Sequence, residues 1–134
     1  MKQRVLILCV GNSCRSQMAE GFLRHWAGTR YEVHSAGTRP SVLNSKAIQV
    51  MGEIGIDISQ HRSKSVNDFE GQAFDHIVTV CDAAKESCPV FPHIKRILHW
   101  NFEDPADAQG SEDSILQVFR RVRDEITTQF KAHF

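Results

Sequence analysis

Short apolar runs alternate along the chain with longer segments in which apolar residues recur every three or four positions. The short runs are typical of buried strands, and the longer spacing is typical of amphipathic helices. Strands are predicted over residues 5–9, 31–35, 74–81 and 94–100. Helices are predicted over residues 18–27, 44–54 and 115–130, with Asn44 as the cap of the second and with Gly28 and Gly55 as stops of the first two.

Strands that alternate with helices predict an α/β fold, in which a parallel sheet carries helices on both faces. Ligands of such folds bind beyond the carboxyl ends of the strands. The predicted first, third and fourth strands end at Cys9, Cys81 and Trp100. We therefore expect the residues that carry chemistry to gather along one edge of the sheet.

Composition narrows the function. The 134 residues suit one domain, which we expect to span residues 1–134. Lysine plus arginine equal aspartate plus glutamate at 16 each, and this balance argues against a nucleic-acid partner or a membrane surface. The first apolar run is too short for a signal-peptide core, and no run approaches a membrane span. We expect a monomeric cytoplasmic protein, whose four cysteines indicate catalysis, redox chemistry or metal binding before structural disulfides.

The segment from Cys9 to Ser16 lies between the first predicted strand and helix and has the spacing C-x5-R-S. Its backbone N–H groups, the start of the helix and the Arg15 guanidinium can all face one tetrahedral oxyanion. The same surroundings can lower the pKa of the Cys9 thiol, so that a nucleophilic thiolate dominates. The residues expected to bind the substrate are Val10, Gly11, Asn12, Ser13, Cys14, Arg15 and Ser16.

Three of these loop residues have more specific expected roles. Gly11 can adopt a left-handed backbone that turns successive N–H groups inward. Asn12 is a candidate for holding the shape of the loop through side-chain hydrogen bonds. Ser16 can place a hydroxyl group near the thiolate.

A simpler interpretation competes with the phosphate-type loop, because the spacing alone arises by chance. Cys9 would then be an inert thiol at a strand end, and Arg15 a solvated residue of the first helical turn. The strand–turn–helix context, with glycine and serine inside the loop, favours the anion site. Cys14 stands beside Arg15 at the helix start, where it cannot be encircled, and we interpret it as a small helix-entry residue.

Cys81 and Cys88 form a second pair of thiols, separated by a polar stretch. A zinc site is one interpretation, but the cysteine spacings are not the tight ones of common structural zinc sites. Two inert core cysteines are another, although the polar surroundings of Cys88 argue against burial. A redox pair fits better: Cys81 at the sheet edge could reach Cys9, and Cys88 on a mobile loop could then reach Cys81.

Asp104 precedes Pro105 just after the fourth predicted strand. A carboxyl group there could donate a proton to a leaving oxygen, but aspartate is also among the commonest turn residues. From the residues alone these two interpretations are nearly equal. The histidines have neither metal-ligand nor triad spacing, and we expect the following on the surface without a role: His25, His61, His93 and His133.

Residues 5–20, with Cys9 and the run from Arg15 to Glu20, closely resemble the low-molecular-weight protein tyrosine phosphatase superfamily. Asp104-Pro105 matches the general-acid motif of that superfamily. Cys81 and Cys88, at this separation, are similar to the redox pair of its thioredoxin-coupled arsenate reductase branch. The resemblance runs along essentially the whole chain and implies a three-layer fold, with a four-stranded parallel sheet in the order 2-1-3-4 and helices on both faces.

The resemblance also implies arsenate as the substrate and a relay of three thiols. The loop and Arg15 hold arsenate, the Cys9 thiolate attacks arsenic, and Asp104 protonates the leaving oxygen. Cys81 then attacks Cys9 and arsenite departs, Cys88 attacks Cys81, and thioredoxin reduces the Cys81–Cys88 disulfide. The redox step needs neither a metal nor an organic cofactor.

Some reductases of this kind place a potassium ion beside the loop, and Asn12, Glu20 and Ser35 match three of its four ligand positions. Lys64 stands at the fourth, where its ammonium group could take the place of the cation near Glu20. A lysine that merely extends from a loop into solvent is the alternative. We therefore expect no metal site in this protein.

Three other functions stay open. A phosphatase would hydrolyse phosphate monoesters through a Cys9 phosphocysteine without needing Cys81 or Cys88, although no aromatic residue follows the Asp-Pro pair here as in many such enzymes. Weak phosphatase activity is also conceivable as a side reaction of a reductase. A reductase recycled by glutaredoxin is a nearer variant. A flavodoxin-like binding or redox-sensing domain would need neither Arg15 nor Asp104.

Overall fold

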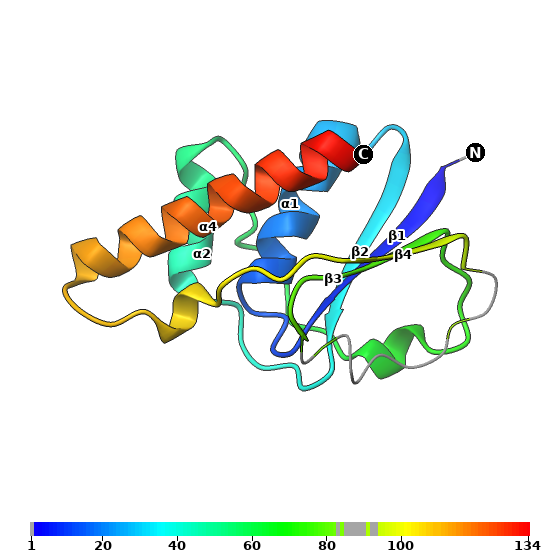
Figure 1. Cartoon of the computed structure of the whole chain (residues 1–134), viewed down its shortest axis with the longest axis horizontal. Coiled ribbons are helices and arrows are strands. Elements are labelled where there is room, and N and C mark those ends of the chain that lie inside the picture. The colour runs from blue at the N-terminus through cyan, green and yellow to red at the C-terminus, as the bar shows by residue number, and fades with distance from the viewer. Residues whose placement is uncertain (1, 83, 85–90, 92–93) are drawn as a thin grey trace.

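Four parallel strands form one sheet in the order β2-β1-β3-β4, as the resemblance implied (Figure 1). The computed structural model describes residues 2–82, 84, 91 and 94–134. The strands are β1 (Gln3–Cys9), β2 (Tyr31–Gly37), β3 (His76–Thr79) and β4 (Arg96–His99). The described helices are α1 (Arg15–Ala27), α2 (Ser45–Glu53), α4 (Glu112–His133) and the 3-10 helices η1 (Val66–Phe69) and η2 (Pro105–Asp107).

Local signals set the ends of the first two helices as predicted. α1 ends at Ala27, and Gly28 is its C-cap. Asn44 caps α2, where its side-chain oxygen accepts the backbone N–H groups of Lys46 at 2.8 Å and Ala47 at 3.3 Å. These bonds satisfy donors that have no partner inside the helix.

β3 and β4 are shorter than the sequence predicted. β3 ends at Thr79, so Cys81 lies beyond its strand, and β4 ends at His99, so Trp100 follows it. The backbone still runs beside β1 past this end, because Val80 donates its N–H to a β1 carbonyl at 2.9 Å. An apolar run continues through such a segment, so the pattern cannot reveal where regular pairing stops.

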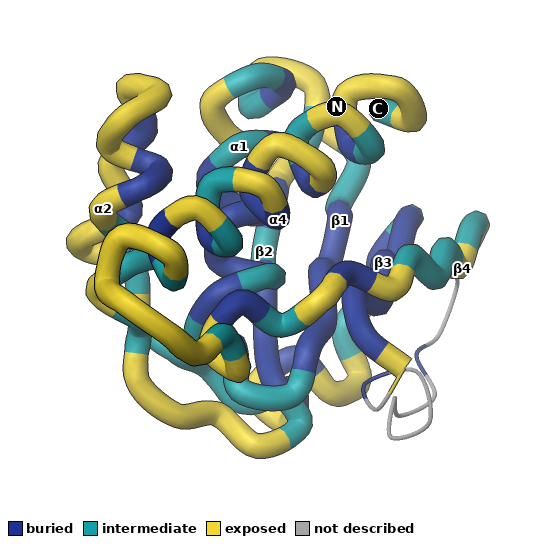
Figure 2. Tube along the Cα trace, turned by 60° about the vertical axis from the view of Figure 1, so that its left-hand side comes forward, coloured by how far each residue is buried: buried dark blue, intermediate teal, exposed yellow. Residues whose placement is uncertain are grey.

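Helices cover both faces of the sheet. Ser35 of β2 donates its hydroxyl to Glu20 of α1, whereas the neighbouring His34 packs against Phe69 of η1 with ring centroids 5.3 Å apart. Successive side chains of a strand point to opposite faces, so α1 and η1 lie on opposite sides. α4 packs against α1 and α2, and Figure 2 shows β1 and β3 buried whereas the edge strand β4 is partly exposed.

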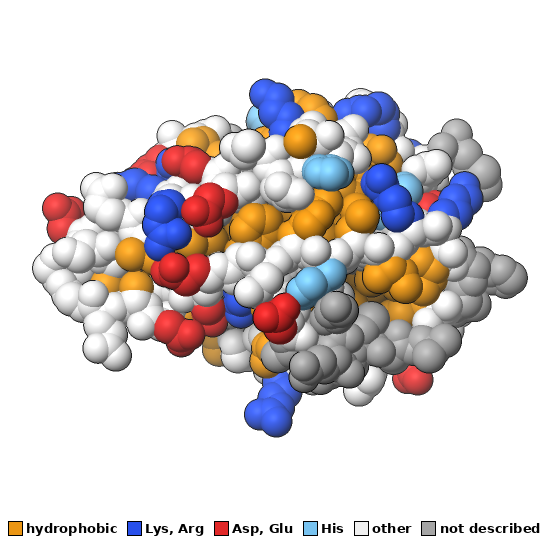
Figure 3. All heavy atoms as spheres, viewed as in Figure 1, with side chains coloured by type: hydrophobic (Ala, Val, Ile, Leu, Met, Phe, Trp, Pro, Cys, Tyr) orange, Lys and Arg blue, Asp and Glu red, His pale blue; other side chains and the backbone are white. Residues whose placement is uncertain are grey.

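The core lies between the sheet and the helices. Hydrophobic side chains also gather in a band between α4 and the segment after β4 (Figure 3), where Trp100 packs edge-on against Phe130 with centroids 5.1 Å apart. No helix in the described ranges is apolar over the length needed to cross a membrane. The largest fully buried side chains are Leu6, Ile7, Leu8, Met18, Leu23, Met51, Ile58, Phe74, Ile77, Phe119, Ile126 and Phe130.

Two helical glycines provide a test of this packing. In α1, a Cβ at Gly21 would come within 2.6 Å of Cγ2 of the buried Ile58, whereas a Cβ at Gly52 in α2 would meet nothing within 4 Å. Alanine gains about 0.5–1 kcal/mol of helix stability at either site, but overpacking at Gly21 costs about 1–3 kcal/mol. We expect Gly52→Ala to raise, and Gly21→Ala to lower, the free energy of unfolding in urea. Equal stability of the two variants would contradict the packing of α1.

Candidate active site

The loop between β1 and α1 is anchored from outside by the segment that follows β2. Four carbonyl oxygens, those of Cys9, Val10, Gly11 and Ser13, accept backbone N–H groups of residues 38–44 at 2.8–3.2 Å. In a trans peptide the N–H points away from the C=O, so these bonds direct the loop's N–H groups inward. The N–H of Asn12 donates to the Cys9 Sγ at 3.1 Å. The loop thus forms the concave array of donors that oxyanion binding requires.

Asn12 adopts the left-handed backbone conformation that we expected of Gly11. Its φ is 49°, while the glycines with positive φ lie elsewhere in the chain. Asparagine enters this region more readily than most residues, because its short polar side chain can bond locally. Gly11 has a different use: a Cβ there would come within 3.3 Å of the Ser41 Oγ, so glycine allows the loop to pack closely against its anchor.

The buried side chain of Asn12 makes the hydrogen bonds that were expected to hold the loop. Its Nδ2 donates to Ser16 Oγ at 2.7 Å and to Ser35 Oγ at 2.9 Å. Its Oδ1 accepts from Gln17 Nε2 at 3.0 Å and from the Lys64 backbone N at 2.9 Å. These four bonds join α1, β2 and residue 64 to the left-handed turn, and they satisfy both donors and both lone pairs of the amide.

The directions of these bonds follow from the donors available. Ser16 Oγ accepts from Asn12 and lies 2.8 Å from Cys9 Sγ, so its own proton can point at the sulfur. Ser35 Oγ likewise accepts from Asn12 and donates to Glu20 Oε1 at 2.6 Å. One chain of polar groups therefore connects a buried carboxylate to the candidate nucleophile, and such chains polarise their members.

Glu20 is the charged end of this chain, and its side chain is only 3% exposed. Its Oε1 lies 3.4 Å from Lys64 Nζ, and its Oε2 lies 3.3 Å from both Arg24 and His61. A buried carboxylate needs such partners, because an unpaired buried charge is costly. The ammonium group of Lys64 thus lies beside Glu20 as expected, and the alternative of a lysine that extends into solvent is wrong.

His61 is not the surface residue that the sequence suggested. Its side chain is 14% exposed, its Nδ1 lies 3.0 Å from Gln17 Oε1, and burial lowers its pKa. Gln17 also donates to the Arg62 carbonyl at 2.9 Å, and Ser63 donates its hydroxyl to the Asn12 carbonyl at 2.7 Å. Sequence reasoning gave Gln17 and Ser63 no role, because isolated polar residues carry no periodic signal of burial.

Burial raises the pKa of the Cys9 thiol, which contradicts the lowered pKa expected from the sequence. Hydrogen bonds from Ser16 and Asn12 and the charge of Arg15 act in the opposite direction but offset only part of the effect. Burial also raises the pKa of Cys14 to about 12. Cys14 is the N-cap residue of α1 and is 2% exposed, in line with its interpretation as a helix-entry residue.

Arg15 and Asp104 lie side by side next to the loop. Arg15 NH1 donates to the Phe102 carbonyl at 3.0 Å, and NH2 lies 3.4 Å from Asp104 Oδ2. The other Asp104 oxygen accepts the N–H of Ala106 at 3.0 Å and caps η2. The turn interpretation of Asp104 is therefore correct, while its second oxygen stays directed at the guanidinium group, where an acid could act.

Cys81 follows β3 at the same edge of the sheet at which β1 ends in Cys9. Leu8 of β1 pairs with Thr79 of β3, so Cys81 follows just past the position opposite Cys9. Neighbouring strands lie about 4.8 Å apart, and a disulfide needs Cα atoms within about 7 Å. Within the described ranges, Cys9, Cys14 and Cys81 are free thiols, and Cys81 is 5% exposed. Cys88 and the polar stretch before it lie outside the described residues.

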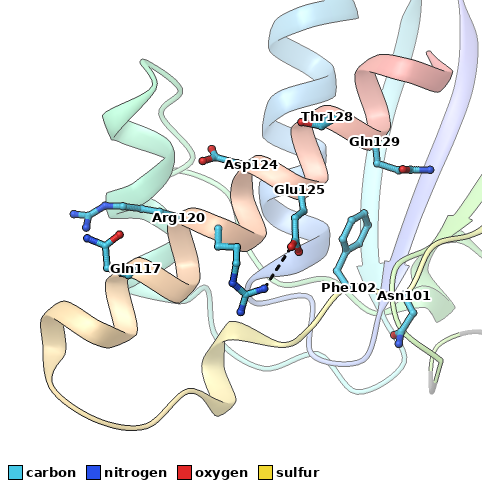
Figure 4. A pocket seen from close by; sticks show the side chains of 9 residues that line it. Asn101, Phe102, Gln117, Arg120, Asp124, Glu125, Thr128 and Gln129 are labelled. Carbon is cyan, nitrogen blue, oxygen red and sulfur yellow. Dashed lines mark hydrogen bonds and ion pairs between the residues drawn. The ribbon is translucent and has the colours of Figure 1, made fainter.

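A groove of about 800 Å³ lies apart from these thiols, between α4 and the segment after β4 (Figure 4). Phe102 and Asn101 form one side, and α4 provides charged residues such as Asp124 and Glu125 on the other. Phe102 is only 9% exposed, which makes it a core residue rather than a docking surface. Phe102 links the groove to the site, because its carbonyl oxygen accepts from Arg15.

Relatives identify the class of protein to which this fold and loop belong. Residues 4–134 match the family described as low molecular weight phosphotyrosine protein phosphatase, and the chain belongs to this family. An arsenate reductase of Halalkalibacterium halodurans is 45% identical over 130 residues, covering 97% of this chain and 94% of that protein.

Solved structures agree with this assignment. An arsenate reductase in the phosphate-binding state superposes with a TM-score of 0.80 at 31% identity, covering 97% of this chain and 95% of the other. A thioredoxin-dependent arsenate reductase of Corynebacterium glutamicum is 27% identical with a TM-score of 0.69, covering 98% of this chain and 61% of the other. The fold is therefore shared with proteins of the reductase branch.

The raised pKa of Cys9 gives a pH-dependent prediction. A raised pKa keeps the thiol protonated to higher pH, so we expect alkylation of Cys9 by iodoacetamide to accelerate only above the ordinary thiol range of about 8.5. Ser16→Ala removes a hydrogen bond that stabilises the thiolate and should shift this curve upward by about half to one pKa unit. Ser13→Ala is the matched control, because its hydroxyl contacts Cys14 instead. An unchanged curve in Ser16→Ala would contradict the direction assigned to this hydrogen bond.

Proposed function

We propose that this protein reduces arsenate to arsenite and passes the oxidation through Cys9, Cys81 and Cys88 to thioredoxin. The observation that supports the proposal is that Cys81 follows the end of β3, which pairs with the end of β1 that carries Cys9, because ester hydrolysis needs no second thiol there. The similarity to arsenate reductases, one of them thioredoxin-dependent, supports the substrate and the reductant. The chemistry needs no metal or organic cofactor, and reduced thiols of this kind suit the cytoplasm.

Arsenate is a tetrahedral oxyanion, and the loop offers it two kinds of donor. The inward backbone N–H groups surround its oxygens, and Arg15 adds a planar fork that fits two of them. The guanidinium group has five N–H donors, so its contacts with Phe102 and Asp104 leave others for the substrate. Two or more charge-assisted hydrogen bonds fix arsenic above the sulfur of Cys9.

The first step joins Cys9 to arsenic. Because burial keeps the Cys9 proton in place, the bound oxyanion accepts that proton, and the Ser16 hydroxyl then stabilises the thiolate. Sulfur attacks arsenic, an As–S bond forms, and one arsenic–oxygen bond breaks. Asp104 supplies a proton to the departing oxygen, which leaves as water.

The second step moves two electrons. The Cys81 thiol releases its proton, which restores the acid form of Asp104, and the resulting thiolate attacks Cys9 Sγ. An S–S bond forms, and the As–S bond breaks with its electron pair left on arsenic. Arsenic falls from the +5 to the +3 state, and the two thiols become one disulfide. In sum, arsenate and two thiols give arsenite, a disulfide and water. Cys88 then displaces Cys9 from Cys81, and thioredoxin reduces the Cys81–Cys88 disulfide.

The relay predicts the behaviour of Cys88→Ser. We expect the unmodified chain to form arsenite continuously with thioredoxin, thioredoxin reductase and NADPH. Cys88→Ser should form at most one arsenite per chain and stop as a Cys9–Cys81 disulfide, identified by peptide mapping. Cys14→Ser is the matched control and should keep turning over, because Cys14 has no part in the relay. Repeated turnover of Cys88→Ser with thioredoxin as sole reductant would reject the relay.

A parallel assay with phosphotyrosine separates the proposal from the phosphatase alternative. A reductase should show arsenate-dependent NADPH oxidation and at most slow phosphate release. Rapid phosphate release that survives the loss of both Cys81 and Cys88, without arsenite formation, would identify a phosphatase. Replacing thioredoxin by glutaredoxin and glutathione in the same assay tests whether glutaredoxin, rather than thioredoxin, recycles the enzyme.

Arg15 supplies a second prediction. Lysine keeps the positive charge but not the planar fork, so we expect Arg15→Lys to lower kcat/KM for arsenate by about 100-fold or more. The same change at the exposed Arg121, which pairs with Glu103 and Glu125 on the surface, should leave kcat/KM unaltered. A kcat/KM for arsenate close to that of the unmodified chain in Arg15→Lys would show that a point charge suffices and that the planar guanidinium group is not required.

A further inference from the structure

His99, at the end of β4, bridges two residues on either side of Cys81. Its Nδ1 lies 2.7 Å from Thr79 Oγ1, and its Nε2 lies 2.6 Å from Asp82 Oδ1. A carboxylate only accepts, so Nε2–H donates to Asp82, and in the neutral ring Nδ1 accepts the Thr79 hydroxyl proton. Thr79 is 2% exposed and lies directly opposite His99 in the ladder, so the imidazole is fixed by the sheet itself.

The bond to Asp82 has little value for stability. The Asp82 side chain is 70% exposed and that of His99 is 23% exposed, and exposed ion pairs stabilise proteins by about 0–1 kcal/mol. The bond instead fixes the position of the backbone on the C-terminal side of Cys81. Val80 is tied to β1 through its N–H, and Asp82 is tied to β4 through His99. Cys81, between them, is therefore held from both sides after the regular strand has ended at Thr79.

We propose that His99 is a positioning residue for the second thiol. This inference rests on the proposed function, because it concerns the step in which Cys81 attacks Cys9 and arsenite leaves with the electron pair of the As–S bond. Thiol–disulfide exchange requires the attacking sulfur at a defined distance and angle, and a misplacement of about 1 Å can cost about 100-fold in rate. His99 keeps the backbone at Cys81 in the place from which that attack occurs.

The test is a single turnover in the Cys88→Ser chain, which stops after the Cys9–Cys81 bond has formed. Arsenite release and the loss of two thiols are followed in rapid-quench samples at several arsenate concentrations. We expect His99→Asn to slow disulfide formation by about tenfold or more while the arsenate concentration for half-maximal rate stays unchanged. Asparagine places its amide where Nδ1 was and can keep the Thr79 bond, but it cannot reach Asp82.

The conservative variant is His99→Gln, whose longer amide reaches the position of Nε2 and can donate to Asp82. We expect it to recover the rate to within about threefold of the parent. Asp82→Ala should slow the step as His99→Asn does, and the double variant should be no slower than either single one. The matched control is His34→Asn, which breaks a comparable exposed bond to Glu32, 2.8 Å long, on the opposite edge strand. It should leave the rate unchanged.

The outcomes are distinguishable. Equal rates in His99→Asn and its parent, or additive effects of His99→Asn and Asp82→Ala, would overturn the positioning role alone. A higher arsenate concentration for half-maximal rate in His99→Asn would also overturn the positioning role, because the defect would then lie in arsenate binding by the anion loop. If the parent Cys88→Ser chain forms no arsenate-dependent Cys9–Cys81 disulfide, the proposed function fails and the positioning role with it.

Discussion

The left-handed turn at Asn12 is the constraint on which the site depends. Without that turn the backbone N–H groups of residues 10–16 would not converge, and Cys9 would be an ordinary buried thiol at a strand end. A non-glycine residue at φ 49° is strained unless its surroundings hold it there. They do so through the four side-chain hydrogen bonds of Asn12 and through the two donors, Gln17 and Ser63, on its carbonyl. Strain at the loop is thus balanced by a buried polar network rather than by apolar packing.

The same network explains why an acidic residue is buried beside an anion site. Glu20 would repel an oxyanion if its charge were unbalanced, but the cationic groups of Lys64 and Arg24 lie beside it. Its carboxylate accepts from Ser35, which orients Ser35 to accept from Asn12, and Asn12 in turn orients Ser16 toward Cys9. Because the Asn12 Nδ2 group can only donate, it makes both hydroxyl oxygens acceptors and leaves the Ser35 proton for Glu20 and the Ser16 proton for Cys9. The groups that would bind the anion are the N–H groups of the loop and the guanidinium group of Arg15, which are not part of this buried network.

Much of this arrangement is visible in the sequence, and the part that is not has a physical reason. Apolar periodicity located the strands and helices, and the C-x5-R spacing at a strand–turn–helix junction located the loop. The sequence predicts the left-handed conformation at Gly11, because glycine adopts it most readily. The structure has it at Asn12 instead, because the buried hydrogen bonds of the asparagine side chain hold that conformation. The pKa of Cys9 was expected to fall, because the sequence shows the neighbouring charge but not the depth of burial. The apolar pattern does not predict that polar residues contact the loop or its neighbours. The structure shows such contacts for His61, Gln17 and Ser63.

The Asn12 side chain, rather than its backbone freedom alone, holds the anion loop in shape. Calorimetric titration of inorganic phosphate and arsenate into Asn12→Gly tests this role most directly, because glycine adopts a positive φ without strain but makes none of the four side-chain bonds. We expect oxyanion affinity to fall by about tenfold or more in Asn12→Gly, because several buried hydrogen bonds are removed. Affinity equal to that of the unmodified chain would show that the turn forms without the network.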